Sequence, residues 1–317
     1  MACSFKLSRR IARLRAPLFA SLIVTLVACD TSESLDPISS TTPAETVEEV
    51  VLAESDTELA AASFAGGIPI GMAAQPVSEF GQRFTGGKRT IGPGKLLTEL
   101  SQIRSRGGRV ILMFAGHPRN YRDGNNHFSF EKWKGRVDDY KRLDFDQYVK
   151  DGTVVGHYLI DEPNDPRNWG GKPVPASMVE QMAKYSKDLW PGMATIVRVE
   201  PEYLGNDHRY LDAAWAAYLW RRGNVHDYLR SNVAAAQKRG LQLVVGLNVI
   251  DGGNPKKTPM TAREVEEWGS AMLESSYPCA FIMWTHNSTY LKSNGMPNAM
   301  DALSRKAKSR STKSCRG

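Results

Sequence analysis

The sequence predicts an α/β fold, a parallel (β/α)8 barrel of the TIM type that occupies residues 65–317. Apolar runs alternate with helical patterns along this whole segment, which is typical of parallel β/α units. The segment holds 253 of the 317 residues, close to the roughly 250 of one such barrel. In addition, one apolar run ends in two carboxylates and a proline, and barrels of this class build their sites at the carboxyl ends of strands.

Seven strands can be placed from apolar runs, most of which contain β-branched residues, although the alanines of residues 213–219 would also suit a helix. The expected strands are residues 68–73, 109–115, 153–161, 194–199, 213–219, 241–250 and 280–285. We expect the eighth strand to be hidden between residues 72 and 109, or to be short and irregular. This arrangement makes the run that ends at Asp161 strand four and the run that ends at Thr285 strand eight.

Helical patterns fill the intervals between these strands. The expected helices are residues 94–106, 131–140, 144–150, 176–189 and 225–238, with two more that open near residues 261 and 297. Gly107 and Gly240 are the expected C-caps, Pro175 belongs to a first turn, and Thr261 and Glu264 form a capping box.

Asp161 and Glu162 are the main candidates for catalysis. Pro163 cannot donate a ladder hydrogen bond, so the strand should stop there with two carboxylates at its carboxyl end. Strict alternation would point the two side chains to opposite faces, so both serve one site only if the strand ends or bulges at Asp161. Alternatively, Glu162 caps the next helix and Asp161 binds backbone amides in the turn.

Asp161-Glu162-Pro163 resembles the Asn-Glu-Pro signature of glycosidase (β/α)8 barrels, with Asp in place of Asn. The resemblance implies that Glu162 is the general acid/base of a glycoside hydrolase. Glycosidic cleavage needs such a proton donor and a second carboxylate that acts as nucleophile or activates water. Asp161 could orient Glu162, raise its pKa through like charge, or bind a sugar hydroxyl.

The identity of the second carboxylate is open. The glycosidase family carries a Glu at the end of strand seven, but residues 244–251 contain no Glu, and Asp251 is the nearest substitute. Glu200, on the strand after Asp-Glu-Pro, is the other candidate. An adjacent Asp-Glu pair also resembles enzymes that use the N-acetyl group of the substrate as the nucleophile, in which Asp161 would orient the acetamide.

Polar and aromatic residues near strand ends are predicted to bind the substrate. Trp284 resembles the aromatic residue that related barrels place at the end of strand eight as a sugar platform, and a core position is its alternative. Arg198 could pair with Glu200 or with an acidic sugar. For His157 the alternative is a hydrogen-bonded interior histidine. The predicted set is His117, His157, Tyr158, Arg198, Asn248, Trp284 and His286.

Residues 1–28 are expected to be a signal peptide and residues 29–64 a lipidated, acidic, flexible tether. Five basic residues precede an apolar run that is too short to span a bilayer comfortably. Residues 26–29, Leu-Val-Ala-Cys, resemble a bacterial lipobox, which implies cleavage before Cys29 and acylation of its thiol. A plain signal peptide is the alternative. We expect an exported lipoprotein that is anchored to a membrane of the bacterial cell envelope.

The charge of the barrel segment favours acidic partners. The chain has 41 basic and 34 acidic residues, of which 5 and 9 precede residue 65, so the barrel carries a formal charge of +11. This suits an acidic or N-acetylated polysaccharide, and a solvated basic face is the alternative. Export and the lack of a binding motif argue against nucleic acid. We expect a polysaccharide substrate, a membrane contact through the lipid anchor, and no cofactor.

The cysteines of the barrel segment are predicted to pair. Cys279 opens the last strand at the bottom of the barrel, and the final helix should run back and deliver Cys315 there. Export makes a disulfide possible. Two free thiols are the alternative.

Two other functions remain open beside the glycosidase. One is a non-catalytic glycan-binding or envelope-structural lipoprotein on the same scaffold. The other is a metal-dependent hydrolase, because five potential ligands could converge, although no His-x-His or His-Glu-x-x-His spacing supports a resident metal. These five residues are His117, His157, Asp161, Glu162 and His286.

Overall fold

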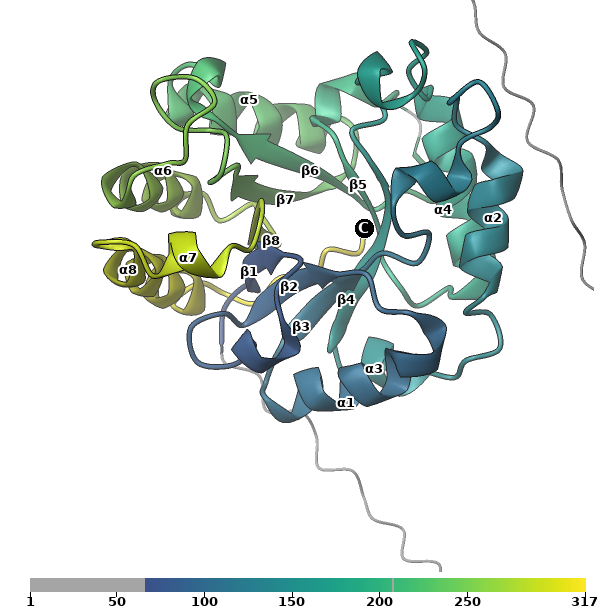
Figure 1. Ribbon diagram of the computed structural model, residues 1–317, viewed down its shortest axis with the longest axis horizontal. Coiled ribbons are helices and arrows are strands. Elements are labelled where there is room, and N and C mark those ends of the chain that lie inside the picture. Colours follow the sequence, from purple (N-terminus) through teal and green to yellow (C-terminus); the bar gives the residue numbers. More distant parts are fainter. Residues whose placement is uncertain (1–65, 207) are drawn as a thin grey trace, which may run out of the picture. The chain divides into compact units, whose positions relative to one another are not determined.

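The computed structural model describes residues 66–206 and 208–317 of the chain (Figure 1). The expected signal peptide, Cys29 and the tether lie outside these residues. The described part contains a closed barrel of eight parallel strands that pair in the order of the sequence, which confirms the predicted fold class. The strands are β1 Ile70–Ala73, β2 Gly86–Arg89, β3 Arg109–Leu112, β4 Val154–Asp161, β5 Thr195–Arg198, β6 Ala213–Tyr218, β7 Gln242–Leu247 and β8 Ala280–Met283.

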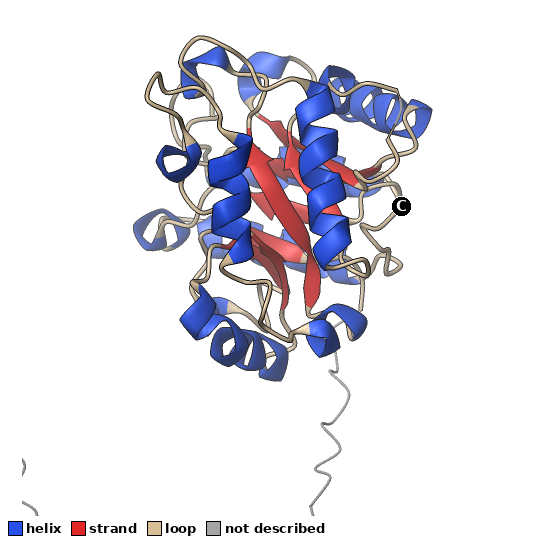
Figure 2. Cartoon of the chain, turned by 90° about the vertical axis from the view of Figure 1, so that its right-hand side faces the viewer, coloured by secondary structure: helices blue, strands red, loops and turns tan. Residues whose placement is uncertain are grey.

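Helices surround the barrel and cover the outer face of the strands (Figure 2). They are α1 Leu96–Ser105, α2 Phe130–Asp138, α3 Asp146–Lys150, α4 Ala176–Leu189, α5 Val225–Lys238, α6 Ala262–Glu274, α7 Ser288–Leu291 and α8 Met296–Lys308. Short 3₁₀ helices lie in the loops: η1 Val77–Glu79, η2 Pro93–Lys95, η3 Pro118–Tyr121, η4 Pro166–Asn168, η5 Pro201–Tyr203 and η6 Trp220–Arg222. Helices α4 and α5 have the predicted limits, and the predicted capping box opens α6.

The strand that the sequence left unplaced is β2, which reads Gly-Gly-Lys-Arg and lies in the interval where it was expected. Its glycines permit a close approach to β1. A Cβ atom on Gly71 of β1 would lie 1.7 Å from the carbonyl oxygen of Gly86, and a Cβ atom on Gly86 would lie 2.6 Å from the side chain of Pro69. Because this contact requires glycine, β2 lacks the β-branched residues by which strands are recognised.

Two apolar layers follow from the alternation of side chains along the strands. The larger layer lies between the barrel and its helices, and includes Trp133, Trp190 and Phe114. The smaller layer fills the barrel interior, where small side chains such as Ala213 and Ala280 leave room for Trp215. The interior is therefore a packed core rather than a pore.

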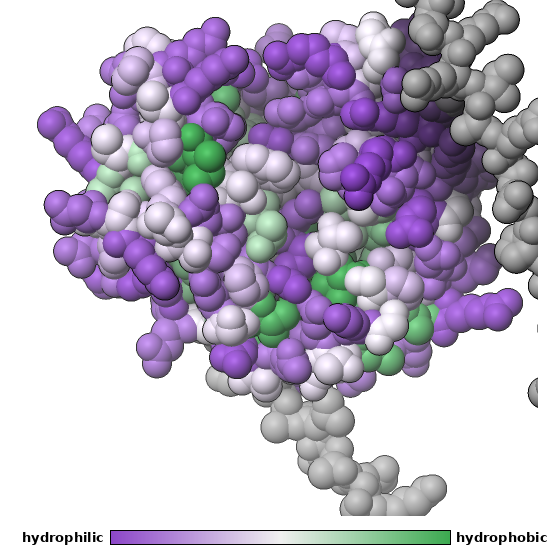
Figure 3. All heavy atoms as spheres, in the orientation of Figure 1, coloured by the Kyte–Doolittle hydropathy of each residue, from purple (hydrophilic) through white to green (hydrophobic). Residues whose placement is uncertain are grey.

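The outer surface is mainly hydrophilic on the face that Figure 3 shows, with apolar residues in separate places. Among the described residues, Leu97 and Trp220 are the large apolar side chains with substantial exposure. No helix within residues 66–206 or 208–317 has both the length and the apolar character needed to cross a membrane.

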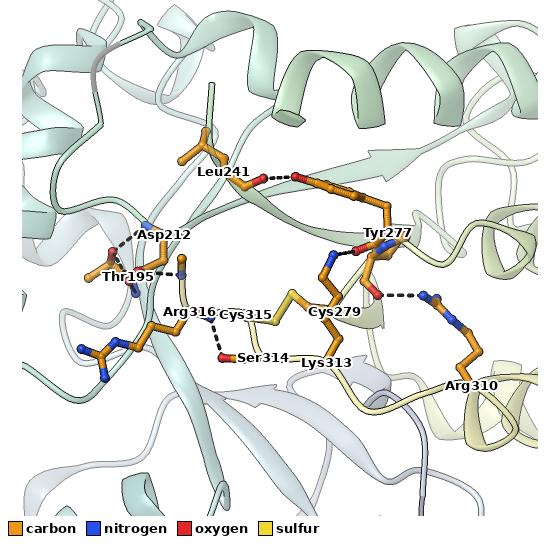
Figure 4. The surroundings of a disulfide bond; sticks show 12 residues. Thr195, Asp212, Leu241, Tyr277, Cys279, Arg310, Lys313, Ser314, Cys315 and Arg316 are labelled. Atoms are coloured by element: carbon orange, nitrogen blue, oxygen red, sulfur yellow. Dashed lines mark hydrogen bonds between the residues drawn. A yellow bond between two sulfur atoms is a disulfide. The ribbon is translucent and has the colours of Figure 1, made fainter. Parts of the chain in front are cut away.

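The predicted disulfide between Cys279 and Cys315 is present, with the Cα atoms 5.2 Å apart (Figure 4). It joins the residue before β8 to the C-terminal tail. The tail is also held by Lys313, whose Nζ donates to the carbonyl oxygen of Tyr277 at 2.6 Å, and by the amide of Gly317, which donates to Asp212 Oδ1 at 3.0 Å. The tail therefore lies at the amino-terminal end of the barrel, opposite the carboxyl ends of the strands.

We expect the double variant Cys279→Ser/Cys315→Ser to lose about 3–4 kcal/mol in free energy of unfolding, because the bond closes a loop with a sequence separation of 36. Denaturant unfolding of the folded domain measures this difference. The reduced wild-type protein is the control and should match the double variant. Equal stability of the oxidised wild type and the variant would contradict a stabilising role for the bond.

Candidate active site

A bulge in β4 turns Asp161 toward the barrel interior. Tyr158 belongs to the interior layer, but Leu159 and Ile160 both pack in the outer layer, so the alternation skips one position. The pairing of β4 with β5 shifts register at the same place, and Asp161 is paired with Arg198. The strand thus bulges just before Asp161 and ends there, which meets the geometric condition for two adjacent carboxylates to serve one site.

Glu162 continues from this strand end with a positive φ of 40°, and its amide donates to the carbonyl oxygen of Arg198 at 3.0 Å. The indole Nε1 of Trp169 donates to the carbonyl oxygen of Glu162 at 3.1 Å. The carboxylate has only longer contacts, at 3.4 Å from Asn168 Nδ2 and 3.4 Å from Arg198 Nη2. Its side chain is 43% exposed, so a firmly held backbone presents an accessible carboxylate.

Asp161 is held more tightly than Glu162. Its Oδ1 accepts hydrogen bonds from Arg198 Nη1 at 2.7 Å and from the hydroxyl of Tyr158 at 2.8 Å. The Arg198 side chain is only 7% exposed, and burial by itself would lower the pKa of its guanidinium. The negative charges of Asp161 and Glu162 oppose this effect of burial, and the pKa of the guanidinium is raised. Asp161 therefore keeps a buried cation in place beside Glu162.

A second buried cation, Lys88 of β2, lies near the aromatic rings of Tyr158 and Trp284. Its Nζ lies 4.8 Å from the ring centroid of Tyr158 and 5.8 Å from that of Trp284, and the Arg198 guanidinium lies 4.6 Å from the Trp284 ring. Burial lowers the pKa of Lys88 to about 8, against the opposing effect of Asp161, and Arg198 lowers it further. Trp284 thus stacks on cations and forms part of the floor of the site.

Two neighbouring cavities open at this end of the barrel, and Glu162 and Arg198 line both. The first, which we call the arginine cavity, has a volume of about 300 Å³. Its lining consists of Glu162, Asn164, Asp165, Pro166, Arg167, Arg198, Val199, Glu200, Trp215, Ala217, Leu219, Arg221 and Arg222. The second has a volume of about 240 Å³ and is lined by Pro118, Asp161, Glu162, Asn168, Arg198, Asn248, Asp251 and Trp284.

Each candidate for the second carboxylate lines one cavity. Glu200 follows β5 and shares the arginine cavity with Glu162, where it pairs with Arg222 and accepts a hydrogen bond from the Tyr228 hydroxyl at 3.3 Å. Asp251 follows β7 and shares the smaller cavity with Glu162. It is exposed, and its amide donates to Asn248 Oδ1 at 3.2 Å. The geometry therefore brings both candidates to the cleft.

His157 does not reach the cleft, so its expected place in the substrate-binding set is corrected. It points to the outer face of β4, where it is fully buried and stacks on Trp133. Its Nδ1 lies 2.9 Å from the Ser186 hydroxyl of α4. Burial lowers the pKa of His157 to about 3. The alternation of side chains along β4 explains this position, since Tyr158 takes the inward one.

The other two predicted histidines lie at the edge of the site. His286 follows β8, and its Nε2 contacts Glu79 Oε1 of η1 at 2.9 Å. His117 is exposed and caps η3, with Nδ1 accepting from the amide of Arg119 at 3.2 Å. Neither residue lines the two cavities.

The five potential metal ligands that could have converged do not form one group. His157 lies behind the sheet and His286 is engaged by Glu79. Within residues 66–206 and 208–317, no three His, Cys, Asp or Glu side chains are grouped so that they could hold a metal ion.

Several residues of the site were not predicted from the sequence. Lys88 was missed because β2 itself gave no strand signal, and Trp215 was missed because its strand was recognised only by small residues. Arg221 and Arg222 follow β6 in η6, and their only sequence signal is that they come just after a strand end. That signal is common to many surface arginines.

Comparison with solved structures shows similarity in fold. An endocellulase from Pyrococcus horikoshii, solved as a complex with cellotetraose, superposes with a TM-score of 0.51 at 12% sequence identity, covering 76% of this chain and 93% of that one. A protein provisionally described as a glycoside hydrolase, from Parabacteroides distasonis, has a TM-score of 0.51 at 12% identity, covering 78% and 96%. No protein-family model and no curated protein matches the sequence. At this identity the comparisons establish the barrel fold alone.

We expect Lys88→Met to raise the free energy of unfolding at pH 7 by on the order of 1–2 kcal/mol, because it removes a buried charge. The wild-type folded state binds the Lys88 proton more weakly than the unfolded chain does. Its stability should therefore rise as the pH increases from about 8, and Lys88→Met should lack this rise. Urea unfolding of both proteins at pH 7 to 10 measures the stability difference and its dependence on pH.

The matched control is Lys292→Met, at an exposed lysine between α7 and α8, which should keep the wild-type dependence on pH. The prediction would be wrong if Lys88→Met were less stable than wild type at pH 7, or if its stability rose above pH 8 as that of wild type does. Either result would show that Lys88 does not carry a destabilising buried charge.

Proposed function

We propose that this protein is a glycoside hydrolase in which Glu162 is the general acid/base. The observation that carries the proposal is that Glu162 and Glu200 line one cavity at the carboxyl end of the barrel. Most glycosidases use two carboxyl groups that flank the scissile bond, and a cavity that both Glu162 and Glu200 line is suited to this arrangement.

In the proposed reaction, the protonated Glu162 donates its proton to the glycosidic oxygen as the bond from that oxygen to the anomeric carbon breaks. Either Glu200 attacks the anomeric carbon and forms a covalent bond to it, or Glu200 removes a proton from a water molecule whose oxygen attacks that carbon. The contacts of Glu200 with Arg222 and Tyr228 stabilise its negative charge. If Glu200 attacks directly, Glu162 then removes a proton from the water that releases the product.

Asp161 and Arg198 are positioning residues in this proposal. The Arg198 side chain donates a hydrogen bond to Asp161 at 2.7 Å, and its carbonyl oxygen accepts a hydrogen bond from the amide of Glu162. Arg198 therefore connects the main chain of Glu162 to the barrel interior. The fold similarity to an endocellulase solved with cellotetraose is consistent with a glycan as the ligand of such a cleft.

The role of Glu162 is tested with the variants Glu162→Gln and Glu200→Gln. On polysaccharides, we expect Glu162→Gln to lower the formation of new reducing ends by about 10²–10⁴-fold, because proton donation to the leaving oxygen is lost. On nitrophenyl glycosides, whose leaving group needs no proton, Glu162→Gln should still release nitrophenolate rapidly in the first turnover. Glu200→Gln should be slow on both kinds of substrate.

Two matched variants accompany this test. Glu131→Gln changes an exposed glutamate of α2 and should leave activity unchanged. Asp251→Asn distinguishes the two partner carboxylates, because a larger loss here than in Glu200→Gln would transfer that role to Asp251. Binding of glycans by wild type without cleavage of any would favour a glycan-binding protein, and full activity of Glu162→Gln on polysaccharides would exclude Glu162 as the acid.

We also propose that the chain is exported and attached to a membrane of the bacterial cell envelope through Cys29. The basic and apolar segments before Cys29 support this, and so does the Cys279–Cys315 disulfide, since disulfides persist in oxidising compartments outside the cytoplasm.

In a bacterial host fed radiolabelled palmitate, we expect Cys29→Ser to lose the label and to leave the membrane fraction. Cys3→Ser, which changes a cysteine of the signal segment, should keep both properties. A labelled Cys29→Ser protein would refute the proposal.

A further inference from the structure

The arginine cavity contains an arginine that no carboxylate neutralises. Four arginines line this cavity, and three of them have carboxylate partners. Arg167 pairs with Asp165, Arg222 pairs with Glu200, and Arg198 pairs with Asp161 and Glu162. Arg221, an exposed residue in η6 at the cavity wall, has no ion pair with any carboxylate of residues 66–206 or 208–317. Its charge is therefore available to a ligand.

Two buried N–H groups of the same cavity also lack an acceptor. They are Nε of Arg198 and Nε1 of Trp215, and both residues belong to the cavity lining. The two residues are only 6% and 1% exposed. A buried donor without an acceptor costs free energy, and an oxygen atom of a ligand that reached these donors would offset that cost.

The net charge of the cavity lining depends on whether Glu162 is protonated, and the proposed reaction starts from the protonated form. When Glu162 carries its proton, three of the four arginines still have a carboxylate partner: Arg167 pairs with Asp165, Arg222 with Glu200, and Arg198 with Asp161. The lining then has one positive charge in excess, that of Arg221. A neutral sugar would leave this excess uncompensated in a partly enclosed cavity, whereas an anionic group on the sugar would compensate it.

We propose that the arginine cavity binds a sugar residue that carries a carboxylate or a sulfate, with Arg221 contacting the anionic group and the N–H groups of Trp215 and Arg198 donating to oxygen atoms of the same residue. This inference rests on the proposed function, because it takes Glu162 in its protonated state. It defines the substrate as an acidic polysaccharide. Arg221 is then a specificity-determining residue.

The test measures binding separately from cleavage. The full-length Glu162→Gln protein, which mimics the neutral state of Glu162, is titrated with oligosaccharides of equal length by calorimetry. The probes are a panel of oligouronates of different linkage, the same compounds after reduction of their carboxyl groups, and their sulfated reduced forms. Preference for the oligouronates or for the sulfated forms identifies the anionic group.

We expect at least one charged oligosaccharide to bind ten-fold or more tightly than its reduced neutral counterpart. When Arg221→Gln is added to the Glu162→Gln protein, most of that preference should be lost and binding should depend less on salt. Trp215→Phe, which keeps an aromatic ring but lacks the N–H group, should weaken binding several-fold. Arg263→Gln, at an exposed arginine of α6 outside the cavity, is the matched control and should change neither property.

The outcomes separate this inference from the proposed function. Equal binding of charged and neutral forms, no binding of any charged form, or a preference that survives Arg221→Gln would overturn the inference. Cleavage of neutral polysaccharides by wild type together with such a result would leave the glycosidase proposal standing. Conversely, an Arg221-dependent preference for charged glycans that wild type never cleaves would support the inference and contradict the glycosidase proposal.

Discussion

The buried guanidinium of Arg198 is the interaction on which the site depends. It binds Asp161 at 2.7 Å, lies 4.6 Å from the ring of Trp284, and approaches the carboxylate of Glu162 at 3.4 Å. A buried cation is costly unless it is paired, so Asp161 and Arg198 require each other. This pair crosses from β4 to β5 and fixes the two strand ends from which Glu162 and Glu200 arise. Lys88 adds a second cation that the core tolerates only beside Asp161 and the aromatic rings.

The bulge of β4 makes this pairing possible. With regular alternation, Ile160 would point inward after Tyr158, and Asp161 would point out toward the helices. Because Leu159 and Ile160 both pack outside, Asp161 faces the barrel interior and Glu162 can follow it into the same cleft. The apolar character of Leu159 and Ile160 suits both to the outer layer. The break in alternation at Leu159 and Ile160 therefore determines that Asp161 faces the barrel interior.

The sequence was a good guide to whatever depends on local pattern. The apolar runs and helix signals predicted seven strands and the limits of α4 and α5, and Asp161-Glu162-Pro163 predicted the principal strand end. What it could not provide depends on pairing between distant segments. Strand β2 begins with two glycines, whose close contacts with Pro69 and Phe80 could not be read from the sequence, and Lys88 was missed with this strand. The contact of Asp161 with Arg198 follows from the register of two strands, and the outward position of His157 depends on which face Tyr158 occupies.

The two adjacent carboxylates differ in their contacts and in their accessibility. Asp161 accepts two short hydrogen bonds from groups that are themselves buried, so its carboxylate is engaged in the ion pair that holds the strand ends. Glu162 has longer contacts and an exposed side chain, so its carboxyl group is accessible to a ligand while its backbone remains fixed. A general acid must come within hydrogen-bond distance of the atom that it protonates, which favours Glu162 over Asp161 for that role. The barrel fold is shared by proteins with many activities, so it is this difference, rather than the fold, that argues for catalysis at Glu162.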